Sequence, residues 1–102
     1  MDLFGGIEAG GTKFLCGVGT HPNDLSTVSF PTASPEETIA KAIQFLQKEA
    51  SGNLKAIGIA SFGPIDLDRE SKTYGYITST PKIGWKNYDF VGAVANALSP
   101  LR

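Results

Sequence analysis

The sequence predicts an α/β fold of one small domain, with a mixed sheet in the order strand, strand, strand, helix, strand. A hairpin and a second helix are expected to follow. Short apolar runs between turn residues fill residues 3–30, which is typical of neighbouring antiparallel strands. An amphipathic pattern covers residues 35–50, and an apolar run at 55–61 follows it directly. A chain of 102 residues that alternates strand and helix in this way fits one α/β domain.

The first two strands flank a glycine turn. Apolar residues enter the turn over 3–7 and leave it over 14–18, and Gly10 and Gly11 lie between them. Adjacent glycines between two apolar runs favour a β-hairpin. Glu8 is expected on the strand face opposite to Ala9, because successive side chains of a strand alternate.

The same turn has the composition of an anion-binding site, and the two interpretations remain equally open on spacing alone. Glycine accepts a positive φ and has no Cβ, so Gly10 and Gly11 would let backbone amides face a bulky anion. The Thr12 hydroxyl and the Lys13 ammonium suit phosphate, and Glu8 is a candidate Mg²⁺ ligand through water. The order threonine then lysine, followed by a strand pattern, is not that of a P-loop.

A third strand and the first helix follow. Residues 21–24 form a turn by composition, and residues 25–30 alternate as a short strand. Ser34 is the expected N-cap of the helix, with Pro35 at its first position and Glu37 completing a capping box. The helix is expected to end at residues 51–53, where glycine and asparagine occur.

Residues 55–61 predict a buried strand that is parallel to an earlier one. Phe62, Gly63 and Pro64 follow at its carboxyl end, which is where α/β sheets bind ligands. A plain loop is an equally good interpretation of these three residues.

The last third of the chain predicts a hairpin of residues 65–68 and 73–78, then a hydroxyl-rich loop and a helix over 88–98. Trp85 ends the loop and would either stack on a sugar or pack beneath the loop. Asp89 is expected near the helix cap, and Ser99 and Pro100 end the helix.

Composition excludes several classes of protein. The formal net charge is −1, and acidic and basic residues are mixed along the chain, so nucleic acid is not an expected partner. No apolar run reaches the length of a membrane span. One cysteine and one histidine can form neither a disulfide nor a structural zinc site. We therefore expect a soluble, cytoplasmic protein.

Three motifs resemble those of the ROK family of sugar kinases and repressors. Residues 6–13, Gly-Ile-Glu-Ala-Gly-Gly-Thr-Lys, resemble the first phosphate motif of the family, and the glutamate at position 8 is similar to the bacterial fructokinase branch. Residues 57–66 and 80–85 resemble the second glycine motif and the third motif of that branch. Lys82 stands where many glucose-specific members have asparagine, which favours the fructokinase branch.

The resemblance implies an actin-like, ribonuclease H-like lobe over residues 1–102, the second lobe being absent from this chain. It implies ATP-dependent phosphorylation of a hexose, with fructose converted to fructose 6-phosphate. The implied cofactors are ATP and Mg²⁺, and the complete enzyme is expected to be a homodimer. The expected cofactor-binding residues are Gly10, Gly11, Thr12 and Lys13, the metal ligand is Glu8, and the substrate-binding residues are Gly63, Pro64, Thr80 and Lys82.

The sequence departs from the family in length. The catalytic aspartate, the adenosine-binding segment and the zinc site of this branch lie in motifs that the sequence never reaches. Asp66, Asp68 and Asp89 match none of these motifs. Because a sugar hydroxyl needs a base to take its proton, we expect this chain alone to be inactive.

Two other functions share part of this sequence pattern. A non-catalytic sugar- or nucleotide-binding module of the same family would use the same phosphate motif, but regulators of this family carry a DNA-binding segment before it, and this chain begins at the phosphate strand. A small metal-dependent nuclease needs several converging carboxylates and a basic face. Only Glu8 is well placed for that role.

Overall fold

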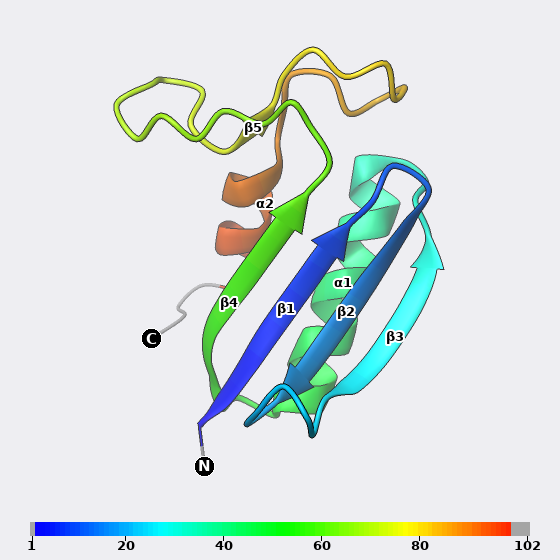
Figure 1. Cartoon of the computed structure of the whole chain (residues 1–102), viewed down its shortest axis with the longest axis vertical. Coiled ribbons are helices and arrows are strands. Elements are labelled where there is room, and N and C mark those ends of the chain that lie inside the picture. The colour runs from blue at the N-terminus through cyan, green and yellow to red at the C-terminus, as the bar shows by residue number, and fades with distance from the viewer. Residues whose placement is uncertain (1, 99–102) are drawn as a thin grey trace.

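The computed structural model describes residues 2–98, which form a four-stranded sheet with helices on one side (Figure 1). The first three strands are β1 (Leu3–Ala9), β2 (Lys13–Gly19) and β3 (Ser26–Pro31). They form the predicted antiparallel meander. Strand β4 (Leu54–Ser61) pairs in parallel with β1, so the strand order is β3-β2-β1-β4. The predicted mixed sheet is therefore confirmed.

Helix α1 (Pro35–Ala50) is the crossover between β3 and β4. Ser34 is its N-cap, as predicted, and accepts a hydrogen bond of 3.2 Å from the Glu37 amide. The helix ends at Ser51, whose φ is 50°, and Gly52 continues the left-handed turn with φ 86°. These caps satisfy backbone groups that a helix end otherwise leaves unpaired.

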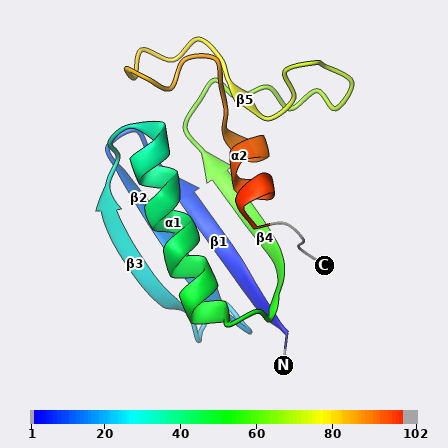
Figure 2. The same ribbon diagram turned by 180° about the vertical axis from the view of Figure 1, so that it is seen from behind.

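Both helices cover the same face of the sheet (Figure 2). Helix α2 (Phe90–Ala97) lies beside α1, and the Asp89 side chain caps it by accepting from the Gly92 amide. The core lies between this helical layer and the sheet, and its completely buried side chains include Phe14, Cys16, Leu46, Trp85 and Phe90. The other face of the sheet is bare within residues 2–98.

The prediction that β4 is a buried strand is wrong. Alternate residues of β4 are exposed, among them Ala56, Gly58 and Ala60. The strand is at the edge of the sheet, and these residues face its bare side. An apolar run indicates burial on both faces only where both faces are covered.

The region after β4 is less regular than predicted. The expected hairpin reverses the chain, but its strands reduce to one bridge between Ile65 and Ile77. The regular strand there is β5 (Tyr76–Ile77), which pairs with β6 (Tyr88–Asp89). The second helix therefore begins at Phe90 rather than at residue 88. The predicted stop at Ser99 and Pro100 lies outside the described residues.

None of the helices in residues 2–98 combines the length and the apolar character needed to cross a lipid bilayer.

Candidate functional site

The turn between β1 and β2 contains the four residues predicted to bind phosphate. The Gly10 amide donates to the Lys13 carbonyl over 2.9 Å and closes the turn. A Cβ at Gly10 would lie 2.7 Å from that carbonyl oxygen, so glycine is required there, whereas a Cβ at Gly11 would meet no atom within 4 Å. Neither glycine has a positive φ. The expectation of left-handed backbone is therefore wrong, and the turn depends on the missing side chain instead.

Thr32, which the sequence analysis did not single out, fixes the conformation of this turn. It follows β3 and is almost fully buried. Its amide donates to the Thr12 carbonyl over 2.8 Å, and its hydroxyl donates to the Gly10 carbonyl over 2.7 Å. In a trans peptide the N–H points away from the C=O, so the Gly11 and Lys13 amides face away from Thr32. Within residues 2–98 the Gly11 and Thr12 amides donate to no protein acceptor.

Glu8 and Lys13 belong to the bare face of the sheet. Glu8 is exposed while its neighbour Ala9 is buried, as the alternation predicts. Glu8 and Leu15 line a shallow hollow of about 650 Å³ on that face. Within residues 2–98, no group of three His, Cys, Asp or Glu side chains is placed to hold a metal ion. Glu8 can therefore contribute one ligand and no complete metal site.

Gly63 and Pro64 follow β4 beside the end of β1. The Phe62 amide donates to the Ala9 carbonyl over 2.7 Å, which holds the two strand ends together. The Pro64 carbonyl accepts from the Thr78 amide over 2.9 Å. Gly63 and Pro64 remain exposed, so their backbone is fixed and accessible at the carboxyl end of the parallel pair, where α/β sheets bind ligands.

The loop from Thr80 to Trp85 lies over the start of α1. Thr80 is buried and accepts a hydrogen bond of 3.2 Å from the Lys82 amide. Pro81, Lys82, Ile83 and Gly84 line a hollow of about 610 Å³, whose other wall is residues 32–36. Lys82 therefore reaches a concave surface, while Thr80 shapes the loop from inside.

Trp85 is not available to stack on a sugar. Its side chain is 0% exposed, and its indole N–H donates to the Ala33 carbonyl over 2.9 Å. The alternative of packing beneath the loop is therefore correct. The residue is hidden from ligands because the rings of Phe14, Phe62, Tyr88 and Phe90 surround it.

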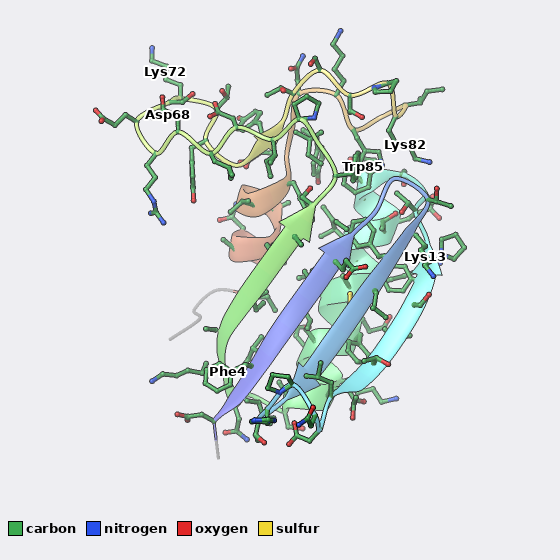
Figure 3. The ribbon with its side chains drawn as sticks, viewed as in Figure 1. Phe4, Lys13, Asp68, Lys72, Lys82 and Trp85 are labelled. Carbon is green, nitrogen blue, oxygen red and sulfur yellow. The ribbon has the colours of Figure 1, made fainter. Side chains whose placement is uncertain are left out.

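Figure 3 shows which candidate residues gather at one end of the sheet. Lys13, Lys82 and Trp85 lie toward that end, whereas Asp68 and Lys72 lie at the tip of a distant loop. Asp66 serves that loop, because the Ser71 and Thr73 hydroxyls and the Asp68 amide donate to its carboxylate. These bonds lower the pKa of the Asp66 carboxyl. The same bonds stabilise the ionised form of the Asp66 carboxylate within the loop.

Comparison with known proteins identifies sequence relatives of this chain. The chain is 54% identical over 94 residues to the fructokinase of Streptococcus mutans, covering 91% of this chain and 32% of that protein. It is 51% identical over 96 residues to the fructokinase of Lactococcus lactis, covering 93% of this chain and 32% of that protein. The chain thus spans about a third of the length of these curated relatives.

Two solved structures share the fold. A ROK family glucokinase from Streptomyces griseus, in complex with glucose and AMPPNP, matches with a TM-score of 0.71 and 22% identity, over 94% of this chain and 30% of that one. A ROK hexokinase from Thermus thermophilus matches with a TM-score of 0.68 and 28% identity, over 93% of this chain and 32% of that one.

The fold is the actin-like N-terminal lobe found in sugar kinases, as the resemblance implied. The family model for ROK matches residues 4–100. This chain belongs to the ROK family, and the two sequence relatives described above are fructokinases.

Proposed function

We propose that residues 1–102 form the N-terminal lobe of a two-lobed kinase that transfers a phosphoryl group from ATP to fructose and yields fructose 6-phosphate. The observation that carries this proposal is the 54% identity with a fructokinase over 94 residues. The family resemblance supports, in addition, a cytoplasmic homodimer. The remaining two thirds of the relatives' length would supply the second lobe.

The turn at residues 10–13 is the proposed binding site for the phosphates of ATP. The Gly11 amide has no protein acceptor among the described residues, and open space lies beside Gly11. Lys13 adds an exposed ammonium group. A hydrogen bond to a charged group contributes about 1.5–3 kcal/mol, so two or three such bonds would hold the phosphates in place.

The cofactors fit the residues present. Bound ATP would supply the phosphoryl group, and Mg²⁺ would neutralise charge on its phosphates. Glu8 is the carboxylate nearest in sequence to the turn and would hold Mg²⁺ through water, because a single carboxylate leaves most positions of the ion to water and phosphate. Positioning and charge neutralisation are the main requirements of phosphoryl transfer, and these residues provide both.

The proposed sugar side consists of the exposed backbone at Gly63 and Pro64 and the loop that carries Thr80 and Lys82. The ammonium group of Lys82 suits a hydroxyl or a developing negative charge on the sugar. The base that accepts the proton of the sugar hydroxyl would come from outside this chain. Asp66 and Asp89 are unsuited to that role because each carboxylate already accepts hydrogen bonds within its own segment.

A coupled assay with fructose and Mg-ATP tests the proposal. We expect phosphorylation by a full-length version that carries this sequence and none by the 102-residue chain alone. Glucose and mannose in parallel assays would test the choice of hexose. Absence of phosphorylation of all three sugars by the full-length version would refute the kinase assignment and favour a binding module.

Substitution of Gly11 tests the phosphate site without disturbing the fold. A Cβ at Gly11 meets no protein atom within 4 Å and the φ of Gly11 is not positive, so Gly11→Ala should melt at or slightly above the temperature of the parent. In the full-length version we expect it to raise KM for ATP at least tenfold, with little change in KM for fructose. The matched control is Gly58→Ala, which also meets no atom within 4 Å. An unchanged KM for ATP in Gly11→Ala would remove the turn from the proposal.

A further inference from the structure

Two consecutive residues connect the candidate phosphate turn, which is residues 10–13, with residues 80–85, which we call the sugar loop. Thr32 holds the carbonyls of Gly10 and Thr12, as described above. The next residue, Ala33, accepts the indole N–H of Trp85, and its own amide donates to the Thr38 hydroxyl over 2.8 Å. The short link between β3 and α1 therefore carries hydrogen bonds to both loops.

The Trp85 side chain contacts a residue next to each of the other candidate segments. The centroid of its ring lies 5.8 Å from the ring centroid of Phe14, which directly follows Lys13. It lies 5.5 Å from the ring centroid of Phe62, which directly precedes Gly63. Both distances are typical of packed aromatic pairs. The turn, the Gly63 segment and the sugar loop thus meet at one buried indole.

The sugar loop itself depends on its two ends. Thr80 and Trp85 are buried, whereas Ile83 between them is 93% exposed. The hydrogen bonds of the loop are mostly internal, from the Lys82 amide to Thr80 and from the Trp85 amide to the Lys82 carbonyl. The position of Lys82 relative to the rest of the lobe is therefore set largely by where Trp85 is anchored.

We propose that Trp85 is a positioning residue, which, through its hydrogen bond to Ala33 and its contacts with Phe14 and Phe62, holds the sugar loop in register with the phosphate turn. This inference rests on the proposed function. It assigns no contact with substrate to Trp85, because the side chain is buried. Its role would be to keep Lys82 at a fixed place relative to Lys13.

Trp85→Phe tests the proposal, because phenylalanine retains an aromatic ring and loses the indole N–H. In the full-length version we expect KM for fructose to rise at least fivefold and KM for ATP to change less than twofold. The matched control is Tyr88→Phe, which also alters one ring of the cluster and should leave both values within twofold. Thr32→Val should show the opposite split, with KM for ATP raised, because it frees the Gly10 carbonyl from the hydroxyl.

Hydrogen exchange on the 102-residue chain tests the anchoring independently of any activity. Trp85→Phe should raise the exchange rates of the backbone amides at positions 82 and 85, which are the hydrogen-bonded amides of the loop, at least tenfold and leave those of α1 unchanged, and Tyr88→Phe should change neither. Unchanged exchange in the loop would overturn the proposal, even if the kinase is active. Equal rises in both KM values together with faster exchange in α1 would also overturn it, because that result describes a general loss of stability. An inactive full-length parent with faster loop exchange in Trp85→Phe would overturn the kinase assignment and leave the anchoring supported.

Discussion

The two faces of the sheet are built from the same strands and differ in almost every other respect. The face toward α1 carries the side chains of Ile7, Phe14 and Cys16, all nearly inaccessible to solvent. The bare face carries Phe4 and Leu15, which are substantially exposed, and a row of glycines at positions 6, 17 and 58. Neighbouring residues of one strand therefore contribute very differently to stability. Their contributions depend on what covers each face, which the strand's own sequence does not specify.

The largest expected contrast comes from the same substitution on the two faces. Leu46 of α1 is 0% exposed and Leu15 of β2 is 38% exposed. We expect Leu46→Ala to lower the free energy of unfolding by about 2–5 kcal/mol, because it removes buried methyl groups and leaves a cavity. Leu15→Ala should cost less than about 1 kcal/mol, because its site is already open to water. Urea denaturation of the 102-residue chain measures both values.

Equal losses in the two leucine variants would break the comparison. That result would mean that the bare face is covered in solution, and sedimentation at several concentrations would then show whether a second copy covers it.

Two adjacent glycines give the next contrast. A Cβ at Gly5 would lie 3.1 Å from Leu46 Cδ2 and 3.2 Å from Leu54 Cδ1, whereas a Cβ at Gly6 would meet no atom within 4 Å. Gly5→Ala should therefore destabilise by about 1–3 kcal/mol through overpacking. Gly6→Ala should stabilise by about 0.5–1 kcal/mol, because alanine loses less backbone entropy on folding. Thermal unfolding of the two variants checks the difference in sign.

The reactivity of a thiol should also differ between the two faces of the sheet, because a buried thiol ionises at a higher pH than an exposed one. Burial raises the pKa of the Cys16 thiol to about 11. At pH 8 its thiolate fraction is on the order of one thousandth, against roughly a tenth for an exposed thiol with the ordinary pKa of 9.0. Iodoacetamide should therefore label native Cys16 very slowly. In Leu15→Cys we expect one label to be added rapidly and a second only in urea, and mass spectrometry counts them.

The same raised pKa predicts the sign of a pH effect on stability. The unfolded chain releases the Cys16 proton near the ordinary value of 9.0, whereas the folded chain retains it to about pH 11. The unfolded state then binds fewer protons over that interval, so stability falls as the pH rises from 9 to 11. Cys16→Ala should show a smaller fall, and an identical fall in parent and variant would contradict the assignment to this thiol.

Asp66 lies away from both faces and should give the smallest effect. Hydrogen bonds from Ser71 and Thr73 lower the pKa of its carboxyl. A lowered pKa in the folded state adds stability above the unfolded value, and this addition disappears as the pH falls through the folded value. Asp66→Asn should slightly reduce the dependence of the melting temperature on pH between about 5 and 3. If Asp66→Asn lowered the free energy of unfolding by more than Leu46→Ala does, this loop, and not the helical face, would dominate stability.

The alternation of residues in β1 predicted correctly that Glu8 and Ala9 lie on opposite faces of the sheet. The N-cap of α1 and the parallel orientation of β4 could also be predicted, because they rest on Ser34 and on the helix that precedes β4, whereas the identity of its partner strand β1 came from the structure. The exposure of β4 could not, because it depends on the absence of a covering layer. The residues after β4 pair as strands of only two residues each, and strands this short leave little local pattern.

The candidate site divides in the same way. The predicted residues at positions 10–13 do form one turn, and their role in binding ATP stays a prediction. Thr32 and Ala33 were missed, because their importance comes from hydrogen bonds to residues far away in the sequence. Thr32 and Gly10 are 22 residues apart, and Ala33 and Trp85 are 52 residues apart. A threonine between a strand and a helix cap is too common to signal such a role.

The parallel pairing of β1 with β4 also constrains the order of folding. The meander and α1 form by closing short loops. The pairing of β1 with residues 54–61 requires closing a much longer loop, which contains β2, β3 and α1. Closing a longer loop costs more chain entropy before any contact compensates for it. The ends of β1 and β4, which the Phe62 amide joins, should therefore be among the last parts to assemble, and refolding followed by pulsed hydrogen exchange should protect the amides of α1 before those of β4.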